Sequence, residues 1–427
     1  TKTKMKLQKL LIAALAITST NALATDGYFA HGYGVKSQGM GGVGIALPQD
    51  ALAAATNPAG MGLIGDRIDF GATWFRPIRE SEIVGNAGPI NAVYKANDTK
   101  NFIIPEFGYN KVINDQMTLG VSVYGNGGMN TDYKNGIPLF DGMGHRAGVD
   151  LIQLFIAPTA TWKINPSNTV GVSVNLAYQR FEAKGLQNFT GQYGNPSPSA
   201  HPNDITDKGH DDSYGAGLKF GWIGQLNDQI SVGATYQTKT YMSKFDKYKG
   251  LFAEAGNFDV PANYGIGLAI KATPALTVAA DLERIEYGDV KSINNPLLPN
   301  FGNQNTPLGT SGGAGFGWRD VTVTKIGASY AYSDCLTLRA GYNHSTQPIP
   351  KSETLFNILA PGVVQDHLTL GATWTLSDKS ELSLSYMHAF ENSVNGNGSI
   401  PPGFGGGNAN LKMYEDSIGI AYGWKLQ

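Results

Sequence analysis

Two histidines and four aspartates in one short stretch are the densest group of side chains in this sequence that could do chemistry. The group is His201, Asp204, Asp207, His210, Asp211 and Asp212. Imidazole nitrogens and carboxylate oxygens can hold a divalent cation. A solvated loop explains the same composition and is the favoured interpretation, so we predict no metal site.

Two glycine patterns match motifs of nucleotide binding and hydrolysis without their structural context. Gly39-x-Gly41-x-x-Gly44 has dinucleotide-loop spacing, but no strand precedes it and no βαβ unit surrounds it. Gly309-x-Ser311-x-Gly313 resembles a nucleophile elbow, yet it lies in a glycine-rich loop. The remaining histidines show no catalytic or ligand spacing: His31, His145, His344, His367 and His388. We therefore predict no enzyme, no catalytic residue and no cofactor.

The N-terminus predicts export. Lys6 and Lys9 flank Met5, the apolar run 10–17 follows, and Ala22-Leu23-Ala24 precedes Thr25. A basic region, a short apolar region and a small-x-small site form a secretory signal peptide, which we place at 1–24 with residues 1–4 as upstream translation. An amphipathic core helix is the alternative, but the stretch has no polar face.

The composition is unlike that of a soluble multidomain protein. The chain has 427 residues, 55 glycines, 20 tyrosines and only 15% charged residues. Its formal net charge of −2 and the lack of a basic stripe give no reason to expect nucleic acid. Cys335 is the only cysteine, so no intramolecular disulfide forms.

Apolar residues alternate with small or polar residues along many segments. In 168–182, Val174 and Leu176 lie on one face and Ser173 and Asn175 on the other. Strict alternation predicts a strand with an apolar environment on one face and water or a lumen on the other. Fourteen such segments lie at 67–79, 102–113, 116–125, 150–164, 168–183, 213–226, 229–244, 259–272, 275–289, 318–333, 335–347, 365–376, 380–391 and 412–426.

The connections between these segments alternate between short turns, such as 114–115, and long loops, such as 184–212. Short turns at one rim and long loops at the other are typical of an outer-membrane barrel. We therefore predict an all-β membrane protein, a 14-stranded antiparallel transmembrane β-barrel over 67–427. Expected interfacial aromatic girdles comprise Trp74, Phe75, Tyr124, Trp162, Tyr332, Trp374 and Trp424. A pair of soluble β-sandwiches would leave the one-sided long loops unexplained.

The segment 25–66 is not strand-like, and its apolar residues favour burial in the lumen over a place in the periplasm. We predict an N-terminal hatch that plugs the barrel. Its motif residues are Gly39, Met40, Gly41, Gly42, Asn57, Pro58, Ala59 and Gly60.

These motifs, with Asp50-Ala51 between them, resemble the start of the FadL/TodX (OMPP1) family of outer-membrane transporters. The resemblance covers essentially the whole mature chain and implies a 14-stranded barrel with a hatch in a Gram-negative outer membrane. It implies uptake of hydrophobic compounds, foremost long-chain fatty acids, with alkanes or monoaromatic hydrocarbons as the alternative. Related barrels usually end on an aromatic residue, whereas this chain ends Leu426-Gln427. Either Trp424 serves in insertion or the terminus is incomplete.

The resemblance also implies capture among the outer loops, transfer to a barrel pocket and lateral release at a kink in the third strand. A path that avoids water suits an apolar solute, because each exposed CH₂ costs about 0.8 kcal/mol. Candidate ligand-binding loop residues are Phe245, Leu251, Phe252, Leu355, Phe356 and Ile358, and plain loop packing explains them equally well. Gly125, Gly127 and Gly128 can permit the kink.

Lys325 and Arg339 are expected on lumen faces, where they could bind a carboxylate ligand. A lumenal salt-bridge ladder with Asp281 and Glu283 is the favoured alternative. Expected partners are hydrophobic small molecules, outer-membrane lipid and lipopolysaccharide, and the barrel-assembly machinery, with the protein acting as a monomer. A general diffusion porin and an outer-membrane hydrolase are the rival functions; the plug and the lack of a catalytic constellation speak against them.

Overall fold

The computed structural model describes residues 25–426. The predicted signal peptide lies outside the described residues. The barrel strands are β1 (Arg67–Val84), β3 (Phe102–Val112), β4 (Met117–Tyr133), β5 (Ala147–Asn165), β6 (Asn168–Lys184), β7 (Asp211–Gln225), β8 (Ile230–Gln237), β10 (Asn263–Lys271), β11 (Leu276–Ile285), β12 (Val321–Ser333), β13 (Leu336–Ser345), β14 (Asp366–Thr375), β15 (Ser380–Asn395) and β16 (Asn408–Lys425).

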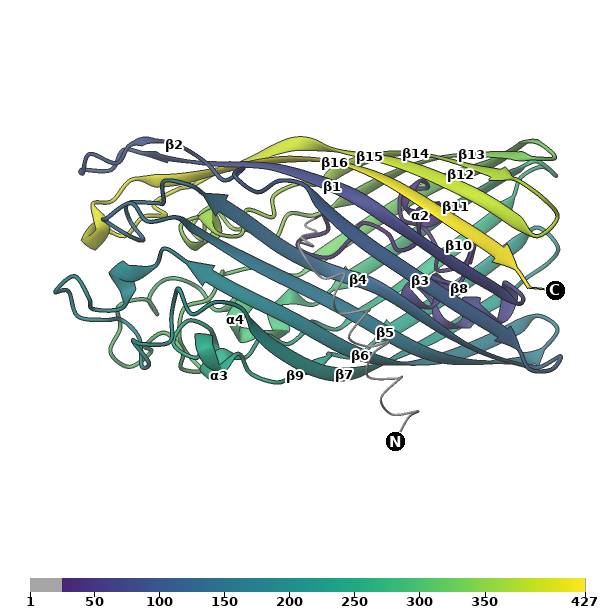
Figure 1. Cartoon of the computed structure of the whole chain (residues 1–427), viewed down its shortest axis with the longest axis horizontal. Helices are drawn as coiled ribbons and strands as arrows, with labels where there is room; N and C mark the ends of the chain where they lie inside the picture. Colours follow the sequence, from purple (N-terminus) through teal and green to yellow (C-terminus); the bar gives the residue numbers. More distant parts are fainter. Residues whose placement is uncertain (1–24, 427) are drawn as a thin grey trace, which may run out of the picture.

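Every neighbouring pair of these strands is antiparallel, and the strands follow one another in chain order around the sheet. The sheet closes where β1 pairs with β16 from Arg67↔Lys425 to Val84↔Asn408. Closure removes the free edges that would leave backbone groups unpaired in lipid. The predicted 14-stranded antiparallel barrel is confirmed (Figure 1).

The two faces of the wall follow the alternation in the sequence. On β6, Val174 and Leu176 are 42% and 47% exposed on the outside, whereas Ser173 and Asn175 are fully buried towards the lumen. Short turns join the strands at the end where the chain terminates, and long loops join them at the other end (Figure 1). We call these the turn end and the loop end.

The remaining elements are short. Residues 25–66 contain α2 (Val35–Gln38), η1 (Ala53–Ala55) and η2 (Pro58–Leu63). The loop end carries β2 (Ala92–Lys95), η3 (Gln187–Phe189), β9 (Tyr241–Met242), η4 (Asp246–Tyr248), α3 (Ala253–Gly256), η5 (Tyr287–Asp289), α4 (Lys291–Asn294), η6 (Phe356–Ile358) and η7 (Pro402–Phe404). Within the described chain, no helix has the length and apolarity needed to cross a bilayer.

Two sequence expectations about the third strand and the girdles were wrong. The strand predicted at 116–125 continues through the glycines to Tyr133, because a register shift between Gly125 and Gly127 absorbs Asn126. Phe75 and Tyr124, predicted in the girdles, are 0% and 3% exposed and face inward.

Four other tyrosines, which face outward near the loop end, donate hydrogen bonds to carboxylates of neighbouring residues. The pairs are Tyr178–Asp212 (2.6 Å), Tyr264–Glu286 (2.8 Å), Tyr342–Asp366 (2.7 Å) and Tyr386–Asp416 (2.8 Å). An aromatic ring with a polar tip suits a membrane–water interface.

Candidate functional site

Residues 25–66 lie inside the barrel, where the purple trace of Figure 1 passes among the strands. The backbone of the glycine motif, residues 39–42, packs directly against the barrel wall. A Cβ on Gly341 of β13 would lie 2.1 Å from the Gly41 nitrogen, and one on Gly327 would lie 2.4 Å from the Met40 oxygen. The Gly41 N–H donates to Thr369 Oγ1 at 2.7 Å. Glycine on both surfaces is therefore what permits this contact.

Asn57 determines the local structure of the second motif of this segment, residues 57–60. Its Oδ1 accepts from the Ala59 N–H (3.0 Å) at the start of η2, with Pro58 at the first helical position. Its Nδ2 donates to the carbonyls of Ile45 (2.8 Å) and Trp222 (3.1 Å), so one side chain joins the turn to the rest of the segment and to β7.

A charged network holds the segment at the turn end. Glu381 of β15 pairs with Lys36 (2.5 Å) and with Arg67 (2.6 Å), and Arg67 pairs with Asp69 (2.7 Å). Asp69 also accepts from the Ala51 N–H at 2.8 Å. The buried charges thus satisfy one another across two parts of the chain far apart in sequence.

Lys325 and Arg339, the predicted carboxylate-binding cations, lie buried against this segment. Lys325 Nζ is 3.3 Å from Glu283 and 3.4 Å from the Gly42 carbonyl. Arg339 donates to Gln49 at 2.9 Å and to Thr373 at 2.6 Å. Asp281 accepts from the Gly44 N–H at 2.8 Å. Lys325 thus forms the ion pair with Glu283 that the salt-bridge alternative expects, whereas these hydrogen bonds of Arg339 go to uncharged side chains.

The wall has a gap between β3 and β4, which we call the window. β4 pairs with β5 from Met117 to Tyr133, but its pairing with β3 covers only Thr118 to Val123. A strand with a free edge has unpaired N–H and C=O groups. Here the N-terminal segment supplies partners: the Gly128 N–H donates to the Tyr28 carbonyl (3.0 Å), and the Ala30 N–H donates to the Asn126 carbonyl (3.1 Å).

Among the three predicted kink glycines, Gly127 has a clear steric role. A Cβ at Gly127 would lie 2.1 Å from the Tyr28 oxygen, so its absence lets the N-terminal segment approach β4. The register shift between Gly125 and Gly127 agrees with a kink in this strand.

An apolar pocket of about 370 Å³ lies between the loop end and the window. Its lining residues are Tyr28, Met129, Val149, Leu151, Phe181, Phe252, Phe258, Ile293, Phe316, Trp318 and Ala360. Tyr28 and Met129 belong to the two elements that meet at the window, so the pocket directly adjoins it.

Of the loop residues predicted to bind ligand, only Phe252 lines this pocket. Phe245, Leu355 and Ile358 are buried, and Leu251 and Phe356 pack on the same cluster. Sequence reasoning missed Val149, Leu151 and Phe181, although alternation along β5 and β6 would have turned them inward. Trp318 was assigned to a strand, but β12 begins at Val321.

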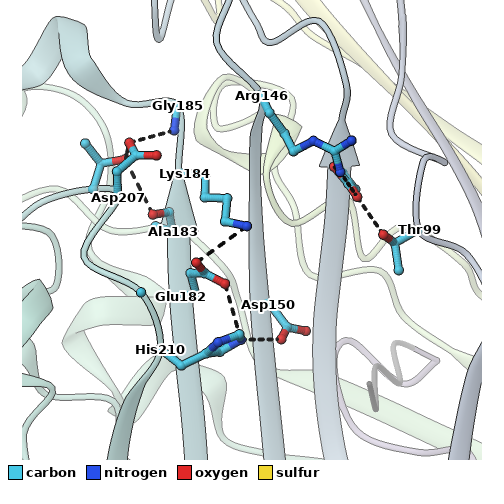
Figure 2. A network of polar contacts seen from close by, with 12 residues as sticks. Thr99, Arg146, Asp150, Glu182, Ala183, Lys184, Gly185, Asp207 and His210 are labelled. Atoms are coloured by element: carbon cyan, nitrogen blue, oxygen red, sulfur yellow. Dashed lines mark hydrogen bonds and ion pairs between the residues drawn. The ribbon is translucent and has the colours of Figure 1, made fainter. Parts of the chain in front are cut away.

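The predicted histidine–aspartate group does not converge. His210 lies on the outside of the wall, 2.9 Å from Asp150 and 3.3 Å from Glu182, which also pairs with Lys184 (Figure 2). Asp207 accepts from the Gly185 N–H (3.1 Å), and Asp204 lies near Lys249. Within residues 25–426, no group of three or more His, Cys, Asp or Glu side chains is arranged to hold a metal ion.

A closed barrel filled by its own N-terminal segment, with an apolar pocket beside an interrupted strand pair, defines a plugged outer-membrane channel. The chain belongs to the OMPP1/FadL/TodX family of outer membrane transport proteins, whose family model matches residues 16–410. This family carries hydrophobic compounds and is made of transport channels. The protein is accordingly an outer-membrane protein of a Gram-negative bacterium.

Solved structures of similar fold support the assignment. The toluene transporter TodX of Pseudomonas putida is 20% identical, with a TM-score of 0.71, and the match covers 93% of this chain and 99% of that one. A Pseudomonas aeruginosa FadL homologue is 15% identical, with a TM-score of 0.69 and coverage of 94% and 100%. The toluene transporter TbuX of Ralstonia pickettii is 18% identical, with a TM-score of 0.65 and coverage of 93% and 99%. A comparison with curated proteins found no match.

Proposed function

We propose that this protein takes up small, neutral hydrophobic compounds, receives them in the apolar pocket and releases them sideways through the window. The lining of the pocket is the observation that favours this class of substrate, because it consists of aromatic and aliphatic side chains and contains no charged group. Placing a carboxylate there would leave a charge without a partner, at a cost of several kcal/mol (order of magnitude). A monoaromatic hydrocarbon has no such group, and two of the similar structures are described as toluene transporters.

The contact between the N-terminal segment and β4 supports the proposed route. Tyr28 lines the pocket and also accepts from Gly128 at the window. Movement of residues 28–30 would therefore open a path from the pocket to the outside of the barrel. In this proposal residues 25–66 act as the hatch, and they also close the lumen to ions, which separates the protein from a general diffusion porin.

Long-chain fatty acids are the second candidate, and a separate pocket favours them. A lumenal pocket of about 480 Å³ is lined by Lys219 and Lys325 together with Asp26 and Glu283. Lys219 Nζ donates to the Ala55 carbonyl at 2.7 Å, and a fatty-acid carboxylate could compete for it. The two ligand classes therefore depend on different residues.

Competition binding to the purified protein tests the substrate class. Trp318→Ala should weaken binding of toluene at least tenfold, and Lys219→Met should leave it within twofold. Binding of a fatty acid that is lost in Lys219→Met and unchanged in Trp318→Ala would overturn the proposal in favour of the second candidate.

A reversible cross-link between the hatch and β4 tests the route. The rings of Tyr33 and Tyr124 are in contact, with centroids 5.1 Å apart, so cysteines at both positions can be bridged by a short cleavable thiol reagent. The exposed Cys335 must first be replaced by serine. Uptake into cells should stop on cross-linking and recover on cleavage. Uptake that continues with the bridge in place would show that the solute does not leave through the window.

A further inference from the structure

A fully buried arginine spans the window on the loop-end side of the hatch contact. Arg79 of β1 is 0% exposed. Its guanidinium donates to the backbone carbonyls of Pro77 (2.9 Å), Thr99 (3.2 Å) and Asn130 (2.8 Å). One side chain thus joins β1, the connection between β2 and β3, and β4 at the level where β3 does not pair with β4.

The partners of the free β4 edge change along its length. Asn126 and Gly128 bond to the hatch, the Asn130 carbonyl accepts from Arg79, and the Asp132 N–H donates to the Ala96 carbonyl at 3.1 Å. On the outside, Thr99 donates to the Asp132 carboxylate at 2.6 Å and Arg146 pairs with it at 2.9 Å (Figure 2). The connection 96–99 is therefore fixed to β4. From inside, Arg79 reaches across the window, and a hydrogen bond between the Ser81 and Tyr133 hydroxyls (2.8 Å) lies next to it.

The hydrogen bonds of Arg79 are unusual for a buried cation. A buried arginine is normally paired with a carboxylate, because the charge is costly to remove from water. Each hydrogen bond that Arg79 donates goes to a backbone or asparagine oxygen. These bonds satisfy the donors but do not neutralise the charge.

A carboxylate without a partner lies on the neighbouring strand. Glu415 of β16 is 0% exposed, and neither of its oxygens has a hydrogen-bond partner within the described residues. Glu415 is opposite Pro77 and Met413 is opposite Arg79, so the Arg79 and Glu415 side chains are diagonal neighbours. Both side chains are buried on the lumenal face of the wall.

We propose that Arg79 is a positioning residue with two alternative partners, the window carbonyls in the closed state and Glu415 in the open state. Rotation towards Glu415 releases the carbonyls of Asn130 and Thr99 and so removes the Arg79 link across the window. The window can then widen beyond the part covered by the hatch when the outer contacts of Asp132 also open. While the window is open, the released carbonyls face the passing solute and lack their hydrogen bonds to Arg79. The new ion pair offsets the loss of these hydrogen bonds. This inference rests on the proposed lateral release and adds the element that controls its width.

Removing the second partner tests this exchange. Glu415→Gln keeps the side-chain volume but offers Arg79 no charge. Toluene uptake should fall about tenfold, whereas toluene binding to the purified protein should stay within twofold of wild type. Asp416→Asn is the matched control, because this neighbour faces outward, where it accepts from His388 and Tyr386, and uptake should not change. Unchanged uptake in Glu415→Gln would overturn the proposal, as would a parallel loss of binding, which would place Glu415 in the ligand site.

The width of the window can be measured directly with spin labels. In a Cys335→Ser background, labels at Asn101, between the connection and β3, and at Leu154, on the outer face of β5, report the distance across the gap. Toluene should produce a second, longer distance in the wild-type protein but not in Glu415→Gln. Arg79→Gln should show the longer distance without toluene, provided that it still shifts on a gel when heated. A single, unchanged distance in the wild-type protein with toluene would also overturn the proposal.

The hatch cross-link described above separates this inference from the proposed function. If the cross-link blocks uptake but Glu415→Gln transports normally, the exchange of partners is wrong and lateral release stands. If uptake continues through the cross-linked protein, lateral release itself is wrong, whatever the Glu415 variant does.

Discussion

At the scale of single residues, some lumenal side chains hold the hatch in place, and others line the pocket that a solute can enter. Lys325 and Arg339 have the charge a fatty acid requires, but their hydrogen bonds go to Gly42 and Gln49. The apolar pocket, in contrast, collects side chains from the hatch, from the three strands β4, β5 and β6, and from the long loops. The chemistry of a residue therefore says less about its role than its neighbours do.

Phe258 offers a direct measurement of what the pocket contributes to binding. Phe258→Ala should weaken toluene binding about tenfold, because removing a ring from an apolar contact costs roughly 1–2 kcal/mol on area arguments. Phe220→Ala is the matched control, since this ring lies on the outside of β7 and is 43% exposed. Equal losses in both variants would point to a general loss of stability and not to a binding contact.

Glu353 makes the loop end sensitive to pH. Burial raises the pKa of its carboxyl above the ordinary value of 4.5, and its Oε2 accepts from the Leu297 N–H at 2.9 Å. A raised folded-state pKa means that the stabilisation is fully present below pH 4.5 and is lost as the pH rises through the raised value.

We therefore expect hydrogen exchange at Leu297, corrected for the intrinsic rate, to be a few-fold faster at pH 7 than at pH 4. Glu353→Gln cannot ionise and should show the same protection at both pH values. A variant that keeps the wild-type pH dependence would place the titrating group elsewhere.

At the scale of elements, the hatch fits the wall through glycines on both surfaces. The contact of Gly41 with Gly341 and of Met40 with Gly327 leaves no room for a Cβ. Close packing of this kind has little capacity to adjust, because the interior of a protein is densely filled. The fit of the hatch therefore depends on the absence of side chains as much as on the charges around Glu381.

Gly341→Ala should displace the hatch without unfolding the barrel. Its new Cβ would lie 2.1 Å from the Gly41 nitrogen, so the hatch must shift and ions should leak past it. Conductance in planar bilayers should rise several-fold over wild type. Gly403→Ala is the control, since no atom lies within 4 Å of a Cβ built there, and its conductance should equal that of wild type.

At the scale of the whole molecule, closure by β1 and β16 makes the barrel one cooperative unit. The pairing of these strands joins the beginning and the end of the barrel sequence over their full lengths. A closed barrel with satisfied backbone groups resists detergent, and boiling converts it to a slower-moving unfolded form on a gel.

The exported protein should show this heat-dependent shift in the outer-membrane fraction, and N-terminal sequencing should begin at Thr25. Both results follow from a cleaved signal ahead of a closed barrel. A protein recovered from the cytosol, or one that retains residues 10–17, would contradict the predicted signal peptide and the proposed start of the hatch.

The sequence by itself determined the number of strands, their direction and their faces, because alternation and turn residues act over a few neighbouring positions. Val174, Ser173 and the turn at Asn114 illustrate this. The family motifs also pointed to a hatch from residues close together in the chain.

Only the tertiary structure decided what those faces meet. Tyr28 bonds to Tyr287, 259 residues away, and Lys36 pairs with Glu381, 345 residues away. The window, the pocket and the separated pair of Arg79 and Glu415 all arise from such contacts. Sequence patterns report the periodicity of one strand, whereas a gap between two strands depends on the register of both and on the segment that packs against them.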